Sequence, residues 1–293
     1  MTLEGLKCFC AVVESGSFRA AAGLVYRSQP AVSQQIKALE RELGHVLIDR
    51  RTCAPTAHGH LLHNRAREIL RESAAIQREM ADQNADAAGE LRLGTSDTTA
   101  VYLLPPYVRR FAARFPKARL SVTSRNSDAI AAQVTRDELD LGLVTLPQRH
   151  PALEEEPVFR QRLRLVAPRA HPLARRERVA LGELRDTPML LLDGQTRTGT
   201  LLRAFFQRAG FTPKVVLDSG SFEVIKRYIA DGMGVSFLPE AVIASRDRSL
   251  AAVAMEGLPE IEIGVIWRRG AYLGRTAREF LALLRKSKGA RDE

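Results

Sequence analysis

The sequence predicts a helical N-terminal domain, one long connecting helix and a C-terminal α/β domain. Residues 1–87 have a helical pattern throughout, apart from a short break near 44–56. From residue 89 onward, short apolar runs alternate with amphipathic segments, which is typical of a mostly parallel sheet with helices on its faces. The length of 293 residues suits two or three domains.

Composition and charge exclude several classes of protein. The chain is 45% hydrophobic and 27% charged, and no apolar run approaches the roughly 18–20 residues that cross a bilayer. The N-terminus lacks the pattern of a secretion signal, so we expect a cytoplasmic protein without a membrane partner. The net charge is +10, but residues 1–90 hold 11 Lys and Arg against 11 Asp and Glu. The net charge is therefore no evidence for nucleic-acid binding. Such evidence has to come from where individual charged residues lie.

Residues 15–44, SGSFRAAAGLVYRSQPAVSQQIKALERELG, are the most informative stretch. Ser17 is placed to cap a helix over 18–25, and three alanines at 20–22 let another helix cross it closely. Ser28 is placed to cap a second helix, with Pro30 in its first turn, that ends at Gly44. Two helices joined by a short turn predict a helix-turn-helix.

The second of these helices has two different faces. Its apolar positions follow a spacing of three and four, which predicts one buried stripe of Val32, Ile36, Leu39 and Leu43. The opposite face carries hydrogen-bonding side chains of a length suited to base edges and phosphates, namely Gln29, Ser33, Gln34 and Lys37. The alternative is a polar face that meets only water, but the caps, the alanines and the early proline together favour a DNA-reading helix.

This stretch resembles the helix-turn-helix of the LysR-type transcriptional regulators. The matching residues are Phe9, SGSFRAAAGL, SQPAVSQQIKALERELG and LIDR at 47–50, and the resemblance continues through Thr56 and Gly59 over essentially the whole chain. It implies a winged helix-turn-helix domain over 1–58, a linker and dimerisation helix over 59–88 and an effector-binding domain over 89–293. Two departures are Gln34, where the family often has a basic residue, and a short wing, RRTCAPT at 50–56. We expect DNA contacts from Ser28, Gln29, Pro30, Ala31, Ser33, Gln34, Lys37, Arg50 and Arg51.

The connecting helix predicts a dimer. Thr56 is placed to cap a helix that runs to about residue 84, with a hinge expected at 85–89. A coiled-coil seam is expected from residues that alternate spacings of four and three, namely Leu62, Ala66, Ile69, Ser73, Ile76 and Met80. Two helix-turn-helix units related by a twofold axis read an inverted repeat in duplex DNA. The resemblance further implies a homodimer or a homotetramer built as two dimers.

The C-terminal part predicts a ligand site where strands end and helices begin. Strands are expected at 91–94, 118–124, 139–145, 163–167, 189–193, 214–218, 234–238 and 261–267, and helices at 99–115, 127–138, 199–209, 221–232 and 274–286. Ligands of open α/β sheets bind beyond the carboxyl ends of the strands, where helix N-termini suit a carboxylate or another small anion. Polar residues gather at four such places: Thr95, Ser96, Asp97, Thr98 and Thr99; Asn126 and Ser127; Gln195, Thr196, Arg197 and Thr198; Ser219 and Ser221. Each set alone is also compatible with an ordinary helix cap, whereas four sets together favour a shared cleft.

The resemblance implies that this domain is two-lobed, like the type 2 periplasmic binding proteins. The first lobe would comprise about 90–160 and 263–293, and the second about 161–262. Arg197 is the one residue of the expected cleft whose fixed charge suits an anion, and the carboxylate of Asp97 argues against a strongly anionic group beside it. The resemblance implies that the four sets of polar residues named above line this cleft.

No pattern for catalysis or for a cofactor is present. GxSxG, HExxH and P-loop motifs are all missing, so we expect no enzyme. The odd number of cysteines, Cys8, Cys10 and Cys53, is typical of a protein in a reducing compartment. We expect them to serve as small apolar residues, and the alternative is a redox or metal-binding role. At the spacing of His58, His60 and His63, the three side chains of one helix do not converge on a metal ion. We therefore expect a group of histidines that faces solvent or lies near DNA.

The predicted function is a sequence-specific transcription regulator that responds to a small-molecule effector between the two lobes. RNA polymerase is a further candidate partner. The alternatives are an architectural DNA-binding protein without an effector and a solute-binding protein, although the latter would need an export signal and would lack the N-terminal domain.

Overall fold

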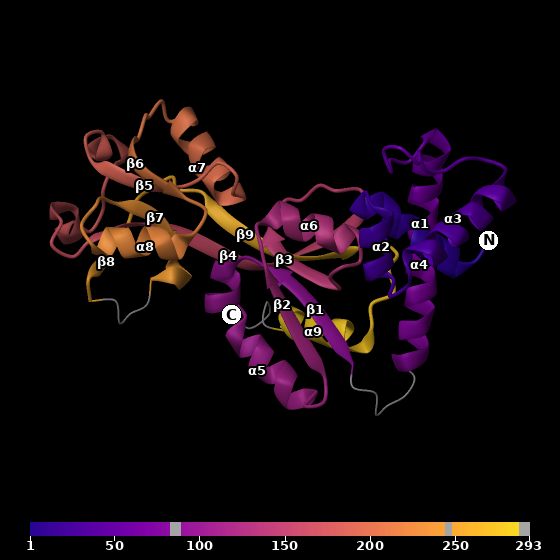
Figure 1. Ribbon diagram of the computed structural model, residues 1–293. Coiled ribbons are helices and arrows are strands. Elements are labelled where there is room, and N and C mark those ends of the chain that lie inside the picture. The colour runs from indigo at the N-terminus through magenta and orange to yellow at the C-terminus, as the bar shows by residue number, and fades with distance from the viewer. Residues whose placement is uncertain (83–88, 244–247, 287–293) are drawn as a thin grey trace. The chain divides into compact units, whose positions relative to one another are not determined.

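The computed structural model describes residues 1–82, 89–243 and 248–286 (Figure 1). The chain divides into two compact units, Met1–Ala85 and Asp86–Glu293. Within the described residues, no helix is both long enough and apolar enough to span a membrane.

The first unit is helical, and its helices begin and end at the predicted caps. The Ser17 hydroxyl accepts a hydrogen bond from the backbone N–H of Ala20, and Ser28 caps the next helix in the same way. Gly44 ends that helix with a positive φ of 73°, a conformation that favours glycine. The helices are α1 Leu3–Ser15, α2 Phe18–Leu24, α3 Gln29–Leu43 and α4 Ala57–Asp82.

The core of this unit confirms most of the predicted stripe of α3. Val32, Ile36 and Leu39 are buried against α1 and α2. The prediction for Leu43 is wrong, because its side chain remains 38% exposed. Helix periodicity places Leu43 on the correct face, but it cannot show how far along α3 the covering helices extend. The buried stripe therefore ends one turn before the helix does.

A short wing joins α3 to α4. Its strands meet at a bridge between Ile48 and Pro55, and the turn is closed by Asp49, whose carboxylate accepts from the backbone N–H of Arg51 at 2.8 Å. Thr56 then caps α4, since its hydroxyl accepts from the Gly59 N–H at 3.1 Å and donates to the Val46 carbonyl at 2.7 Å. The predicted helix end near residue 84 and the hinge residues 85–88 lie outside the described residues.

The apolar residues of α4 serve two different surfaces. Leu62 and Ala66 pack into the core of the first unit, together with Leu70. Farther along the helix Ile76 and Met80 are exposed by 56% and 69%. The predicted seam is therefore wrong for Ala66, which is fully buried within the same chain, whereas Leu62 is only partly covered. The C-terminal part of the seam remains open to a partner.

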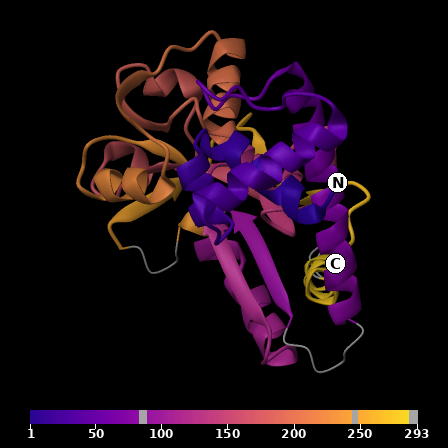
Figure 2. The ribbon, with the colours of Figure 1, turned by 45° about the vertical axis from the view of Figure 1, so that its right-hand side comes forward.

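The second unit is built on a mixed sheet with the strand order β2-β1-β3-β9-β4-β7, with β8 also paired to β4. The strands β1, β2 and β3 are parallel, and they lie side by side in Figures 1 and 2. A separate parallel pair, β5-β6, is joined to β7 by a bridge between Met189 and Val235. The strands are β1 Glu90–Thr95, β2 Arg119–Ser124, β3 Leu141–Thr145, β4 Leu153–Pro168, β5 Pro188–Leu192, β6 Lys214–Ser219, β7 Ser236–Pro239, β8 Leu250–Val253 and β9 Glu260–Arg268.

Two long strands connect the two halves of this unit. The first part of β4, Leu153 to Arg162, pairs with β9, whereas Leu163 to Pro168 pair with β7 and β8. Figure 1 shows β4 and β9 running between the two groups of strands and helices. The sequence predicted only 163–167 of β4 and did not predict β8. Three consecutive glutamates at 154–156 hide the strand pattern, and only its pairing with β9 makes this segment a strand.

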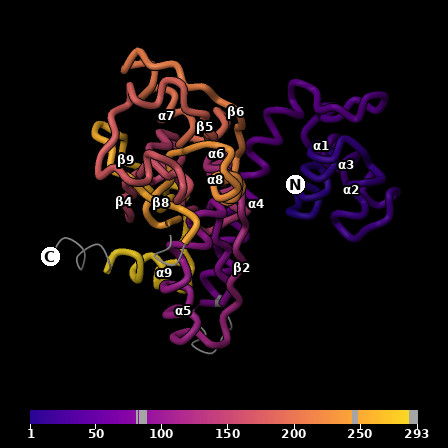
Figure 3. Tube along the Cα trace, turned by 90° about the vertical axis from the view of Figure 1, so that its left-hand side faces the viewer, coloured from indigo at the N-terminus to yellow at the C-terminus, as the bar shows by residue number. Residues whose placement is uncertain are grey.

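The helices cover the two groups of strands separately, as Figure 1 shows, and the trace in Figure 3 shows α5 and α9 next to each other. The helices α5 and α9 pack together through Phe111 and Phe280, whose ring centroids lie 5.6 Å apart, and α6 packs on β3 and β9. The predicted helix over 99–115 is divided into a π-helical turn, Thr99–Leu103, and α5. The longer helices are α5 Pro105–Arg114, α6 Ser127–Thr135, α7 Arg197–Arg208, α8 Phe222–Ala230 and α9 Arg275–Lys286, and short 3₁₀ turns occupy Pro172–Arg175, Leu181–Leu184 and Glu240–Val242. The observed fold class is the predicted one: a winged helix-turn-helix, a long helix and a two-lobed α/β domain.

Candidate DNA-binding face and ligand cavity

The outer face of α3 is polar and open. Gln29, Gln34 and Lys37 are exposed, and Ser33 is half-buried beside them. At the start of the helix Ser28 and Pro30 are exposed and Ala31 is half-buried. Since the opposite face of α3 is packed into the core, these side chains are held on a rigid helix with their polar ends outward.

The two wing arginines differ in their surroundings. The Arg50 guanidinium lies 2.7 Å from the Glu40 carboxylate and 5.2 Å from the centroid of the Phe18 ring. Arg51 is exposed at the tip of the wing, where Asp49 binds its backbone N–H and leaves the guanidinium open to solvent. Arg51 can therefore reach a phosphate without giving up an ion pair, whereas Arg50 cannot.

The histidines near the start of α4 do not converge. His58 is exposed and stacks on His45, with ring centroids 3.9 Å apart and planes 6° from parallel. His63 instead lies half-buried, edge-on to Phe9 and 3.4 Å from the Glu14 carboxylate. The expectation of a solvent-facing group is therefore wrong for His63, because it packs against α1. Within the described residues no three His, Cys, Asp or Glu side chains are grouped as metal ligands would be.

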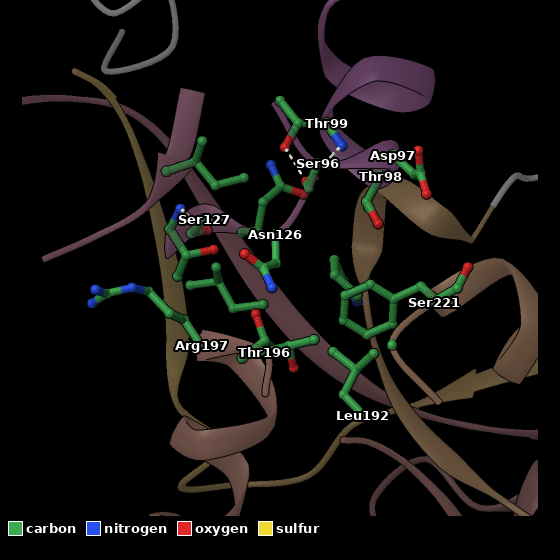
Figure 4. Close-up of a pocket in the computed structure, with 18 of the residues that line it drawn as sticks. Ser96, Asp97, Thr98, Thr99, Asn126, Ser127, Leu192, Thr196, Arg197 and Ser221 are labelled. Atoms are coloured by element: carbon green, nitrogen blue, oxygen red, sulfur yellow. Dashed lines mark hydrogen bonds between the residues drawn. The ribbon is translucent and has the colours of Figure 1, made fainter. Parts of the chain in front are cut away.

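In the second unit, a cavity of about 200 Å³ gathers most of the predicted effector residues (Figure 4). Its wall includes the ends of β1 and β2, the starts of α6, α7 and α8, and parts of β4 and β9. The predicted residues that line it are Ser96, Asp97, Thr98, Thr99, Asn126, Ser127, Thr196, Arg197, Thr198 and Ser221.

Three predicted residues do not line the cavity. Thr95 is fully buried at the end of β1 and does not belong to the cavity wall. Gln195 is exposed in the turn before α7, where its backbone N–H binds the Asp193 carboxylate at 3.0 Å. The Ser219 hydroxyl accepts from the Ser221 N–H at 3.2 Å and supports the neighbouring residue instead. Adjacent positions in these loops point in different directions, which the sequence does not show.

The apolar part of the cavity wall and several of its polar groups were not predicted from the sequence. Leu192 and Phe222 could have been suspected from their neighbours in sequence, but Gln161, Ile261 and Ile263 come from the interior of β4 and β9. Gln161 was not predicted, whereas Thr198 was; each is more than nine-tenths buried and yet faces the cavity. The other residues that were missed are Leu103, Ser124, Arg125, Thr145, Gly220, Pro239 and Ala241.

Helix N-termini contribute partial positive charge to the wall. The Asn126 side chain caps α6 through the Ala129 N–H at 2.9 Å, and Thr196 caps α7 through the Gly199 N–H at 3.0 Å. Both side chains therefore also serve as ordinary helix caps. Ser221, at the start of α8, makes no such side-chain cap bond. Three helix starts around one space favour an anionic or strongly polar group in the ligand.

The formal charges at the cavity are partly neutralised. Arg197 donates to the Asp128 carboxylate at 2.8 Å and to the Gln148 side chain at 3.0 Å, and its side chain extends away from the labelled polar groups in Figure 4. The Asp97 carboxylate accepts from the Ser124 hydroxyl. Arg125 donates to the Ser124 carbonyl at 2.8 Å, and it forms no ion pair with the described residues. The prediction of Arg197 as the charge best placed for an anion is therefore wrong, because Asp128 already compensates it.

Comparison with known families decides the class of this protein. The family described as "LysR substrate binding domain" matches residues 84–288, and "Bacterial regulatory helix-turn-helix protein, lysR family" matches residues 3–60. The chain belongs to the LysR family. It is a transcription regulator with a helix-turn-helix DNA-binding domain and an effector-binding domain.

Relatives and solved structures of LysR regulators cover almost the whole chain. The "Hydrogen peroxide-inducible genes activator" of Dickeya chrysanthemi is 31% identical over 280 residues, which are 93% of this chain and 91% of that protein. The "HTH-type transcriptional regulator SsuR" of Burkholderia cenocepacia is 32% identical, over 90% of this chain and 87% of that one. The structure of the LysR regulator CbnR in complex with its target DNA is 25% identical, with a TM-score of 0.66 over 98% of this chain and all of that one.

Proposed function

We propose that this LysR regulator binds an inverted-repeat promoter site as a homodimer or homotetramer and changes its activity when a small polar effector occupies the cavity. The observation that carries the proposal is the presence in one chain of an open polar face on α3 and a partly enclosed, ligand-sized cavity in the other unit. The proposal includes a cytoplasmic location, contact with RNA polymerase, and no catalytic activity.

The DNA-reading part of the proposal assigns two kinds of contact. Gln29, Ser33 and Gln34 would reach base edges in the major groove, with Ala31 against a thymine methyl group. Lys37 and Arg51 would bind phosphates, because both are exposed cations. Ser28 and Pro30 would lie at the groove edge, and Arg50 at the root of the wing.

The effector part of the proposal assigns a small carboxylate with an apolar portion. The carboxylate would lie near the starts of α6, α7 and α8 and near Arg125, and the apolar portion against Leu192, Phe222 and Ile263. Gln161 and Thr198 would add hydrogen bonds from within the wall. The lobes in this proposal are 90–160 with 263–293, and 161–262, joined by β4 and β9.

The regulatory step would be a shift between two arrangements of the lobes. An effector changes the population of each arrangement only to the extent that it binds one more tightly than the other. Because α4 precedes the effector domain directly in the chain, a change between lobes would alter the spacing of the paired α3 helices on DNA. This would in turn change the bend of the promoter and the recruitment of polymerase.

The test is footprinting of the purified protein on its own upstream region, with and without a panel of small carboxylates. A protected inverted repeat whose extent changes with one member of the panel is the expected result. As a control, Ala241→Leu narrows the cavity without removing a polar group and should abolish the change while leaving the basal footprint. Weak protection of all sequences alike would instead indicate an architectural DNA-binding protein.

A further inference from the structure

Glu40 lies on α3 seven residues, about two turns, after Ser33, and its side chain contacts the wing. One carboxylate oxygen accepts from the backbone N–H groups of Leu47 and Ile48 at 3.0 and 3.4 Å. The other accepts from the Arg50 guanidinium at 2.7 Å. The side chain is only 13% exposed, so this carboxylate is largely enclosed by the three groups that it binds.

The two backbone bonds fix the first strand of the wing. Leu47 and Ile48 are buried, with exposed fractions of 1% and 0%. A buried backbone N–H group needs a hydrogen-bond acceptor. An ionised acceptor forms a stronger hydrogen bond than a neutral one does. Glu40 therefore attaches the start of the wing directly to α3, seven and eight residues earlier in the chain.

The bond to Arg50 holds the end of that strand. Arg50 is enclosed on one side by the Glu40 carboxylate and on another by the Phe18 ring of α2. One carboxylate thus fixes the wing at Leu47, Ile48 and Arg50, on both sides of Asp49, whose side chain closes the turn. The rest of the wing continues from these positions.

We propose that Glu40 is a positioning residue for DNA recognition, which sets the wing relative to α3 and so increases affinity for the specific site despite its negative charge. The proposal rests on the DNA-binding face described above. It makes a prediction opposite to that of simple electrostatics, because a carboxylate near phosphates otherwise weakens binding and its removal strengthens it.

The experiment measures affinity for two duplexes by fluorescence anisotropy with the full-length protein. One is the duplex that the wild type selects from a random library, and the other is a scrambled duplex of equal length. Glu40→Ala should bind the selected duplex about tenfold or more weakly, and the scrambled duplex within about twofold of wild type, because only specific binding needs the wing in register. Glu40→Gln keeps an oxygen for the two N–H groups but loses the charge opposite Arg50, so its loss should be smaller.

Glu42→Gln is the matched control. Glu42 lies two residues farther along α3 and its side chain is 53% exposed, so the substitution removes the same charge without touching the wing. It should leave both affinities unchanged or slightly higher. Hydrogen exchange at Leu47 and Ile48 gives a reading that does not depend on DNA, and it should be faster in Glu40→Ala.

Three results would overturn the inference. Glu40→Ala could bind the selected duplex as tightly as wild type or more tightly, in which case the carboxylate acts only as a charge. Affinity for both duplexes could fall in parallel with the melting temperature, in which case Glu40 serves folding alone. A wild type that selects no duplex contradicts the proposed function itself, and the inference falls with it.

Discussion

The Arg197 guanidinium lies 2.8 Å from the Asp128 carboxylate, so that the first residue of α7 is paired with the first turn of α6. The same guanidinium also donates to the Pro147 carbonyl and the Gln148 side chain. These contacts join segments 49 to 69 residues apart along one side of the cavity. The ion pair neutralises the Arg197 charge at the edge of the cavity and holds the guanidinium away from the polar groups of the wall.

We expect Asp128→Asn to convert Arg197 into an anion site. The pair is partly exposed, and such pairs contribute about 0–1 kcal/mol, so the free energy of unfolding should fall by less than about 1 kcal/mol. The freed guanidinium should bind sulfate, which raises the melting temperature of the variant more than that of wild type. Thermal denaturation in chloride and in sulfate at equal ionic strength measures this. Asp186→Asn, at an exposed position away from the cavity, is the control, and an equal sulfate effect in both variants would contradict the prediction.

Two substitutions on α3 should separate phosphate contact from base reading. Lys37→Ala should weaken binding to specific and scrambled duplexes alike, and should lower the slope of log affinity against log salt by about 1. Gln34→Ala should leave that slope unchanged and cost about 1–3 kcal/mol at the specific site alone. Anisotropy titrations at several salt concentrations distinguish the two. A specific loss from Lys37→Ala, or a changed slope from Gln34→Ala, would reverse the roles assigned here.

A methyl group added at Gly59 should destabilise the N-terminal unit. A Cβ at this position would lie 2.1 Å from the Leu47 carbonyl oxygen and 3.1 Å from the Cβ of Pro55, so α4 and the wing would have to separate. Forced overpacking of this kind typically costs about 1–3 kcal/mol. Gly23→Ala is the matched control, because nothing lies within 4 Å of its added Cβ and alanine favours a helix by up to about 1 kcal/mol. The midpoint of urea unfolding should therefore move to lower urea in the Gly59 variant and to higher urea in Gly23→Ala.

Only one of the three thiols should react in the folded protein. Burial, and secondarily the charge of Glu14, raises the pKa of Cys10 to about 12, and burial likewise raises the pKa of Cys8. Cys10 therefore stays protonated through pH 9, and the upward shift of the Cys8 pKa likewise favours its thiol over its thiolate. The thiolate is the reactive form, so both buried cysteines should react slowly. Cys53 is half-exposed in the wing. A disulfide reagent at pH 8 should modify one thiol per chain, and none in Cys53→Ser, whereas rapid modification of two or three thiols would refute the assignment.

Some relatives are named for hydrogen peroxide, which oxidises thiols. Residues 54–293 contain no cysteine, so the effector cavity has no thiol to oxidise. Any effect of hydrogen peroxide on DNA binding should therefore disappear in Cys53→Ser. A response that persists in this variant would point to Cys8 or Cys10 and to exposure of the α1 core.

The helix-turn-helix could be predicted because its determinants are local. Ser17 and Ser28 bind backbone groups three residues away, and Gly44 adopts the conformation that its missing side chain allows. The stripe of α3 follows from helix periodicity alone. The strand over 153–162 could not be predicted in this way. Its three consecutive glutamates interrupt the alternation of apolar and polar residues that indicates a strand, and its pairing partner, β9, begins about a hundred residues later.

The caps, the buried stripe of α3 and the strand ends at which polar residues gather follow from the order of the amino acids. The folded unit was needed to learn which of those residues face the cavity, that Gln161 and Ile263 complete its wall, and that Arg197 is paired with Asp128. The difference is one of range, because caps and helix faces depend on neighbours within about one or two turns. Cavity walls and ion pairs depend on strands and helix ends that are brought together only when the whole sheet forms.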